Sequence, residues 1–401
     1  MKPKHALCIV VDGLRASALG TYGNTVSPTP AIDALAAEST VCDWMWCDSP
    51  RLADFYRAVW SGGHAAWPAQ GAAAVPLPVQ LRDAGAGVTL LTDDPQCESF
   101  LPVAAVDSAI LVEGPAADSS AATVEETASY RLIAAVAAEI EAAAGDASQA
   151  ARNRLWWVHA KGLAGPWDAP RALRAALLDE EDETPLPEFV LPPQEVATDD
   201  PDELHGYRVA YAAQVGVLDE CLGGLLAATE SLLGEAELLI VLVGARGFAL
   251  GEHGRVGTAV DALYGERLHV PCLVRRAGTA GPQPRRAALL QPNWLHDLLG
   301  EWFASESGSP ATAARPAVEG EPAVVAVGAG GEYAIPPPRW LPRAAPRPAE
   351  SAESLSAVEL FLKPDDRWEA NEIAALCPEV VAELTARAGQ FGLTEESAAT
   401  R

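Results

Sequence analysis

The chain has 401 residues, with 55 acidic and 28 basic side chains and a formal net charge of −27. Hydrophobic residues make up 49% of it and charged residues 21%, a composition that supports a large folded domain and excludes a disordered or disulfide-stapled chain. The excess of negative charge repels nucleic acid, anionic membranes and polyanionic glycans at long range. We therefore expect neither nucleic acid nor a membrane as a partner.

The cysteines indicate an intracellular setting. Seven of them are scattered along the chain without a C-x-x-C pair, which argues against zinc-ribbon and redox motifs. The apolar stretch 6–11 is shorter than the core of a signal peptide, and no later run suggests a membrane span. We expect a cytoplasmic protein with reduced thiols.

Strand-like and helix-like segments alternate along the chain. Short apolar runs rich in β-branched residues predict buried strands, and longer segments with apolar residues at helical spacing predict helices. The predicted strands are 6–11, 88–91, 155–159 and 237–243, and the predicted helices are 29–39, 123–144 and 207–226. This alternation predicts an α/β fold with a mostly parallel central sheet flanked by helices.

Composition divides the chain into a large domain, a linker and a smaller C-terminal part. We expect the α/β domain at 1–303, with an irregular acidic excursion at about 177–205, a linker at 304–322, and strands with a terminal helix at 323–401 that pack on the main domain. The C-terminal expectations are strands at 323–335 and 358–362, a loop at 336–354 and a helix at 370–387.

Three groups of motifs follow one another along the chain. The first strand ends in Asp12-Gly13-Leu14-Arg15, with YGN at 22–24 and TPAIDALA at 29–36. The second group is 211–226, the strand that ends at 243, and LGEHG at 250–254. The third is ELF at 359–361 with DDRWEAN at 365–371. Together they resemble, over essentially the whole chain, the sulfatase family of the alkaline-phosphatase-like superfamily.

The resemblance implies a reaction and a nucleophile position. Sulfatases hydrolyse sulfate esters with a formylglycine made from a cysteine or serine in a C-x-P-S-R run at the start of a helix. The flanking matches Ser49-Pro50 and Ser61-Gly62 place Leu52 at the nucleophile position, and leucine has no nucleophilic group. A rival alignment places Cys47 there, because Cys47 and Arg51 keep the cysteine-to-arginine spacing.

The resemblance also implies a divalent cation held by four carboxylate or amide groups. Asp12 matches the first ligand, whereas Gly13 stands at the second, and Ala245 and Arg246 stand at the other two. A single carboxylate holds a hard divalent cation only weakly. We therefore expect no cofactor, and calcium or another divalent cation only if the site is a divergent active one.

The helper residues differ as well. Asp93-Asp94 stands where the family has a lysine and a histidine, and Ala164 stands at another histidine position. His159 and Lys161 are either ligands for an anion or a solvated surface pair, and His253 either lines a pocket or stabilises a turn. The residues expected around the vestigial site are Asp12, Asp93, His159, Lys161, Arg246 and His253.

A buried Asp12 at the end of a strand needs a positive charge nearby. We predict an ion pair between Asp12 and Arg246 with heavy atoms within about 4 Å; the alternative is that Arg246 points into solvent and Asp12 caps a turn. The sequence thus favours a sulfatase-like protein that has lost sulfuric ester hydrolase activity and has a binding or regulatory role toward an unknown protein or small molecule. The alternatives are an active sulfuric or phosphoric ester hydrolase with a divergent site, and a partner subunit of an active sulfatase.

Overall fold

The fold is described from a computed structural model. It describes residues 2–67, 75–100, 106–114, 119–179, 186–234, 236–259, 262–276, 283–304, 324–329, 332–335, 340–344, 358–390 and 393.

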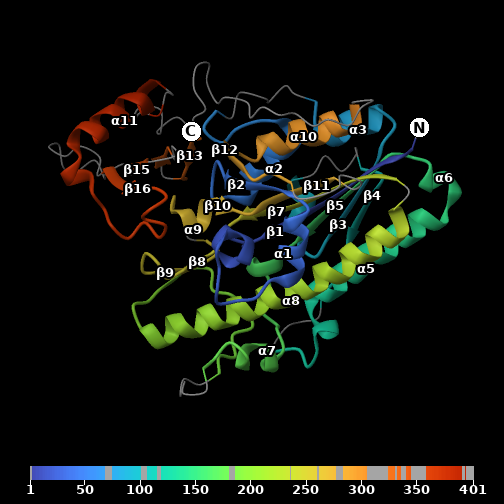
Figure 1. The fold of residues 1–401 in the computed structure, drawn as a ribbon, viewed down its shortest axis with the longest axis horizontal. Coiled ribbons are helices and arrows are strands. Elements are labelled where there is room, and N and C mark those ends of the chain that lie inside the picture. The colour runs from blue at the N-terminus through green and yellow to red at the C-terminus, as the bar shows by residue number, and fades with distance from the viewer. Residues whose placement is uncertain are drawn as a thin grey trace.

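A nine-stranded sheet forms the centre of the molecule (Figure 1). Its strands are β1 (Lys4–Asp12), β2 (Thr40–Trp46), β3 (Gly87–Thr92), β4 (Ser108–Leu111), β5 (Arg154–Ala160), β7 (Glu237–Arg246), β10 (His269–Val270), β11 (Cys272–Arg276) and β12 (Arg286–Leu290). They follow the order β10-β2-β11-β7-β1-β5-β3-β4, and β12 pairs with β2. Strands β7, β1, β5, β3 and β4 run parallel, whereas β11 is antiparallel to both neighbours. The predicted α/β fold is confirmed.

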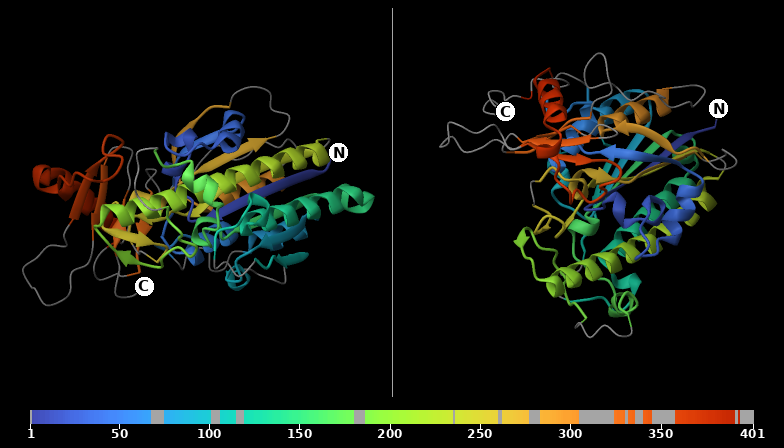
Figure 2. Two further views of the ribbon diagram at one scale, coloured as in Figure 1. Left: turned by 90° about the horizontal axis from the view of Figure 1, so that it is seen from below. Right: turned by 60° about the vertical axis from the view of Figure 1, so that its left-hand side comes forward.

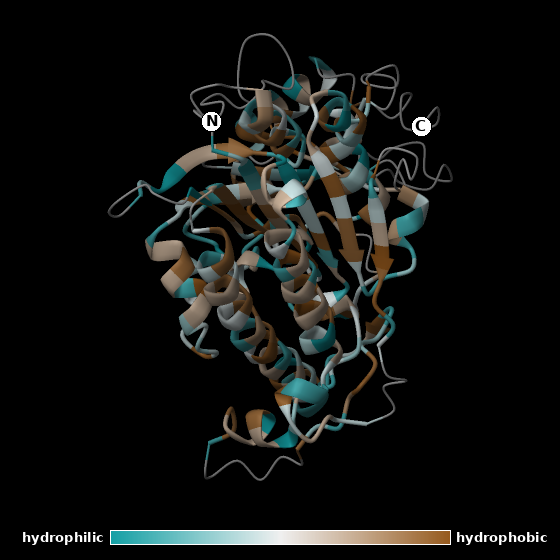
Figure 3. Cartoon of the chain, turned by 90° about the vertical axis from the view of Figure 1, so that its right-hand side faces the viewer, coloured by the Kyte–Doolittle hydropathy of each residue, from teal (hydrophilic) through white to brown (hydrophobic). Residues whose placement is uncertain are grey.

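Helices cover both faces of this sheet (Figures 1 and 2). One face carries α1 (Pro30–Ala37), α5 (Ala128–Gly145) and α8 (Pro201–Leu233), and the other carries α2 (Leu52–Ser61), α3 (Leu77–Asp83) and α10 (Asn293–Ala304). Figure 3 shows hydrophobic residues along the central strands. Alternate residues of β1 enter the two cores: Leu7, Ile9 and Val11 on one side and Ala6, Cys8 and Val10 on the other. Burial on both faces explains the continuous apolar sequence of this strand.

The predicted helices of the main domain exist with shifted boundaries. A 3-10 turn, Val124–Glu126, precedes α5, whose first turn is capped by Thr127. Helix α8 starts at Pro201, where Asp200 caps its first turn. This start lies inside the expected excursion. The excursion at 177–205 is thus shorter than predicted, and it also contains β6 (Val196–Ala197). This strand joins β9 (Arg255–Gly257) and β8 (Ala249–Leu250) in a small sheet.

Helix α8 is the long diagonal helix of Figure 1. By length and composition it could cross a membrane, which the sequence analysis did not expect. However, 72% of its most apolar stretch is buried inside the protein. This burial is typical of a core helix in a globular domain.

The C-terminal part packs against one end of the main domain (Figure 2). It contains an antiparallel sheet of β13 (Ala326–Val327), β14 (Tyr333–Ala334), β15 (Trp340–Ala344) and β16 (Val358–Leu362), followed by α11 (Pro378–Gln390). The loop predicted at 336–354 is wrong at 340–344, where β15 forms although it contains Pro342. The terminal helix begins at Pro378, later than predicted. The linker predicted at 304–322 lies outside the described residues, apart from Ala304 at the end of α10.

The start of α1 is held by a side chain from α8. Both carboxylate oxygens of Asp219 accept hydrogen bonds from the first turn of α1, from Ala31 N at 3.1 Å and from Ile32 N at 2.8 Å. Asp219 is buried, and Thr29 at the N-cap position gives no side-chain cap. A single buried carboxylate therefore caps α1 and joins it to α8.

We predict that Asp219→Ala lowers the free energy of unfolding by about 1–2 kcal/mol, because two buried amide groups lose their acceptor. Urea unfolding followed by circular dichroism measures the change. Asp219→Asn keeps one acceptor oxygen and retains most of the stability, and Glu220→Ala on the exposed side of the same helix serves as the control. An alanine variant as stable as this control contradicts the capping role.

Candidate functional site

Asp12 and Arg246 meet at the ends of the two central strands. Strands β1 and β7 pair in register until Val11 faces Gly244, and the register then shifts so that Asp12 faces Arg246. Ala245 is the extra residue of this β-bulge, which turns Arg246 toward its neighbour. Arg246 Nε donates to Asp12 Oδ1 at 2.8 Å and Nη2 donates to Oδ2 at 2.9 Å. The predicted ion pair is confirmed, and it is bidentate.

The pair is buried on the aspartate side. Asp12 is 1% exposed, while the Arg246 side chain is 20% exposed. Burial by itself raises the pKa of Asp12, but the charge and hydrogen bonds of Arg246, with smaller contributions from His159 and Arg267, bring the pKa below its usual value. Asp12 is therefore ionised at neutral pH and neutralised by Arg246.

The residues around Asp12 do not fit a divalent cation. Both of its carboxylate oxygens already accept hydrogen bonds from Arg246. The side chain of Ala245 is a methyl group, which cannot bind a metal ion. Gly13 has φ of +76°, and a Cβ at this position would lie 2.8 Å from the backbone nitrogen of Ala164. A second aspartate after Asp12 is thus excluded by the local backbone.

Neither candidate nucleophile is available for chemistry. Leu52 is the first residue of α2 and is 5% exposed within the core. Cys47 is fully buried, and its thiol donates to the carbonyl oxygen of Ala245 at 3.2 Å. Burial, with the charge of Asp48, raises the pKa of Cys47. The reactive thiolate is therefore not formed at neutral pH.

Asp94, which follows β3, and His159, near the end of β5, are buried, whereas Asp93 and Lys161 are half-buried. Asp93 Oδ1 accepts a hydrogen bond from Lys161 N at 2.7 Å, and burial raises the pKa of Asp93 to about 6. Asp94 is 3% exposed. His159 is fully buried, so His159 and Lys161 do not form a solvated surface pair.

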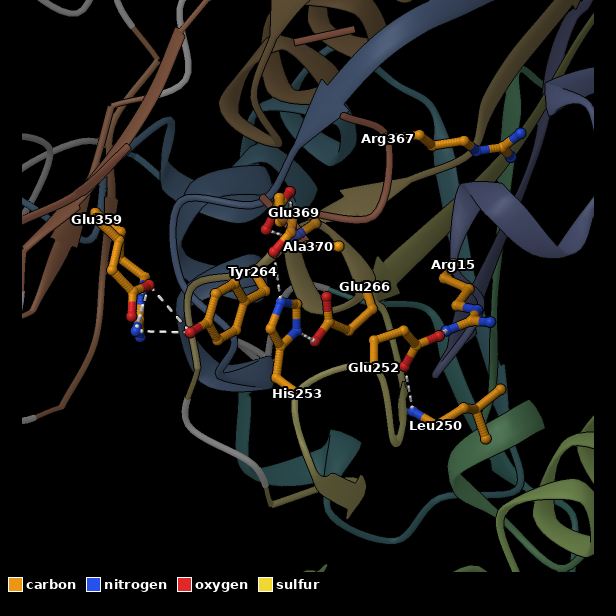
Figure 4. A network of polar contacts seen from close by, with 12 residues as sticks. Arg15, Leu250, Glu252, His253, Tyr264, Glu266, Glu359, Arg367, Glu369 and Ala370 are labelled. Carbon is orange, nitrogen blue, oxygen red and sulfur yellow. Dashed lines mark hydrogen bonds and ion pairs between the residues drawn. The ribbon is translucent and has the colours of Figure 1, made fainter. Parts of the chain in front are cut away.

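His253 joins the main domain to the C-terminal part (Figure 4). Its Nδ1 lies 2.7 Å from Glu266 Oε1, its Nε2 lies 3.2 Å from the carbonyl oxygen of Glu369, and its ring stacks on Tyr264 at 3.5 Å between centroids. Burial lowers the pKa of His253, but these partners outweigh it and leave the pKa raised. The geometry agrees with the turn-stabilising alternative.

Sequence reasoning missed Arg267, which is 1% exposed. Its guanidinium donates to the carbonyl oxygens of Pro50 at 3.3 Å, Thr258 at 2.8 Å and Gly247. It thereby fixes the segment before α2 against the loop after β7. Burial, followed by the charge of Arg246, lowers the pKa of Arg267 to about 10. No motif singles out this residue, because its partners are backbone groups.

A cavity of about 470 Å³ opens beside the Asp12 turn. Arg15 lies on its wall and is paired with Glu252 (Figure 4). The guanidinium carbon of Arg15 lies 5.8 Å from the ring centroid of Tyr211. Arg367 and Trp368 from the C-terminal part complete the wall, and Trp368 is 48% exposed. The cavity therefore combines aromatic surface with guanidinium groups.

Comparison with known proteins gives a structural likeness alone. No family model and no curated protein sequence matches the chain. A protein solved in complex with its substrate D-glucosamine-2-N,6-O-disulfate superposes with a TM-score of 0.69 at 14% identity, covering 98% of this chain and 99% of its own. The phosphonate monoester hydrolase of Agrobacterium radiobacter gives 0.69 at 15% identity, covering 98% and 95%. A 2-O glycosaminoglycan sulfatase gives 0.68 at 14% identity, covering 98% and 92%.

We predict that Arg246→Met lowers the free energy of unfolding by about 3 kcal/mol, because it leaves the Asp12 carboxylate buried without a counter-charge. Since the folded pKa of Asp12 lies below its usual 3.8, the pair contributes stability above that value and loses it as the pH falls through the folded pKa. Urea unfolding across the acid range measures both effects.

The double variant Asp12→Asn/Arg246→Met is the control for this cycle, because it removes both charges and recovers part of the loss. Asp12→Asn alone flattens the acid dependence of stability. An Arg246→Met variant within about 0.5 kcal/mol of the wild type contradicts a role for the pair in stability.

Proposed function

We propose that this chain, which has the fold of sulfatases and phosphonate monoester hydrolases, has lost sulfuric ester hydrolysis and serves as a binding protein. The observation that carries the proposal is the bidentate contact of Arg246 with Asp12. In the alignment implied by the resemblance, Arg246 stands at a metal-ligand position. Its guanidinium supplies the positive charge that a divalent cation supplies to carboxylates in an active site.

Two further features support the loss of hydrolysis. A cation-assisted ester hydrolase needs a nucleophile beside the metal, and here Leu52 and the buried, protonated Cys47 stand at the two candidate positions. The backbone at Gly13 also resists a second aspartate. An active hydrolase would therefore need a different nucleophile and a different way to neutralise its substrate.

The cavity beside Arg15 supports the binding role. Arg367 is partly buried, and burial together with the neighbouring charge of Arg15 lowers its pKa. Arg15 is already paired with Glu252, whereas no carboxylate of the described residues forms an ion pair with Arg367, so the Arg367 guanidinium is the group that can bind an anion. Trp368 adds an aromatic face close to Arg367, whose guanidinium carbon lies 5.0 Å from the ring centroid. We therefore assign to this cavity a small organic anion, in preference to a protein partner.

We predict that the wild-type protein binds neither calcium nor magnesium in calorimetric titrations and does not hydrolyse 4-nitrophenyl sulfate or phenylphosphonate esters. The variant Ala245→Asp/Arg246→Asn, which restores two oxygen ligands beside Asp12, gains calcium binding with a dissociation constant of about 1 mM. Divalent binding or turnover by the wild type that disappears in Asp12→Asn overturns the proposal, whether or not the restored variant folds.

We predict saturable binding of phenyl sulfate, with phenol as the uncharged comparison, in calorimetric titrations. Arg367→Gln weakens phenyl sulfate binding about tenfold, because it removes a charge-assisted hydrogen bond. Arg82→Gln removes an exposed arginine of α3 outside the cavity and serves as the matched control. Equal binding of phenol and phenyl sulfate, or an unaffected Arg367→Gln variant, refutes the anion site.

A further inference from the structure

Three side chains with different metal-binding groups converge behind the ends of β3 and β5. They are Asp94, Cys97 and His159, and one ligand atom from each lies within 4.8 Å of both others. Asp94 is 3% exposed and the other two are fully buried. The sheet register places His159 beside Thr92, two residues before Asp94, and Cys97 begins α4 (Cys97–Phe100). Pairing of β3 with β5 therefore builds the cluster.

His159 gives the cluster a second, independent sign of a ligand. Within the described part of the chain, neither ring nitrogen of His159 has a hydrogen-bond partner, although the ring is fully buried. The closest carboxylate contact is Asp94 Oδ2, 4.0 Å from Nε2, which is too long for a hydrogen bond. Buried polar atoms without partners are rare in folded proteins and call for an unseen group such as a water or an ion.

The combination of donors selects the kind of ion. A thiolate and an imidazole favour zinc and similar transition metals, whereas calcium and magnesium take oxygen ligands. Zinc bonds of about 2.0–2.3 Å in a tetrahedron bring ligand atoms to about 3.5 Å from one another. The 4.0 Å separation of His159 and Asp94 is close to that value. A small inward movement of the side chains therefore closes the site.

Charge balance supports the same ion. The carboxylate of Asp94 and a metal-bound thiolate of Cys97 together neutralise one doubly charged ion, so the occupied cluster carries no net charge into the interior. The charges of Asp12 and Arg246 both act on the cluster. Because the two residues form an ion pair, their effects on it largely cancel. Tyr56 borders the cluster, with its hydroxyl 3.5 Å from Cys97 Sγ.

We propose that Asp94, Cys97 and His159 form a buried zinc site that ties α4 to strands β3 and β5. It shares His159 with the residues expected around the vestigial site at Asp12 but differs from that site in its other members and in its donor types, and its test does not depend on the proposed loss of hydrolysis. A fully buried ion of this kind is structural, since such sites stabilise the folded state outright.

The test uses the full-length protein stripped of metal with a chelator. Zinc titration monitored by calorimetry should show about one equivalent bound, and zinc should raise the melting temperature. Cobalt(II), which replaces zinc in tetrahedral sites, should give a thiolate-to-metal charge-transfer band in the near ultraviolet. Cys97→Ser and His159→Gln should weaken zinc binding about 100-fold or more. Cys221→Ser alters a buried cysteine of α8 outside the cluster and is the matched control.

Each result decides the question. The proposal is overturned if the wild-type protein binds no stoichiometric zinc. A water molecule would then be the partner of His159. A cobalt complex without a thiolate band also overturns the proposal, and this measurement on the wild type does not depend on the folding of the variants. Loss of binding in Cys97→Ser with retention in Cys221→Ser supports it.

Discussion

The structure depends on how one buried carboxylate is neutralised. Strand β1 lies at the centre of the sheet, with both faces covered, and it delivers Asp12 to a place that is 1% exposed. A carboxyl group there must either be protonated or, if it is ionised, be paired with a metal ion or a cationic side chain. This chain uses Arg246, whose planar guanidinium matches both carboxylate oxygens at once. Each oxygen of Asp12 accepts one hydrogen bond from this guanidinium, and the paired charges leave no net negative charge at Asp12.

The scaffold is compatible with this choice because fold and reaction depend on different residues. The two hydrophobic cores fix the sheet and its helices, and none of their contacts requires an ion at Asp12. The bulge at Ala245 still brings the end of β7 beside the end of β1. At the ends of these strands, Arg246 balances the charge of Asp12.

The sequence predicted the parts of the fold with strong local patterns. The apolar runs of β1 and β7 predicted buried strands, and the motif positions of Asp12 and Arg246 predicted the ion pair. Strand β2 was missed because Asp43 and the tryptophans around it obscure the alternation of a strand that is only partly buried. Strand β15 was missed because a proline such as Pro342 usually indicates a loop. In the structure, Pro342 nevertheless lies within β15, opposite Leu360 of β16.

The cluster of Asp94, Cys97 and His159 shows why the rest could not be predicted. His159 lies on β5, Asp94 follows β3 and Cys97 begins α4. The pairing of β3 with β5 brings them together, and a shift of one residue would turn His159 to the other face of the sheet. The inference of a bound ion also depends on the burial of these residues, because the same residues on a surface loop would be hydrated and would need no ligand. Only the three-dimensional arrangement brings an imidazole without hydrogen bonds together with a carboxylate and a thiol. The charges of Asp12 and Arg246 both act on His159, and because they are paired they keep the net charge beside the cluster close to zero.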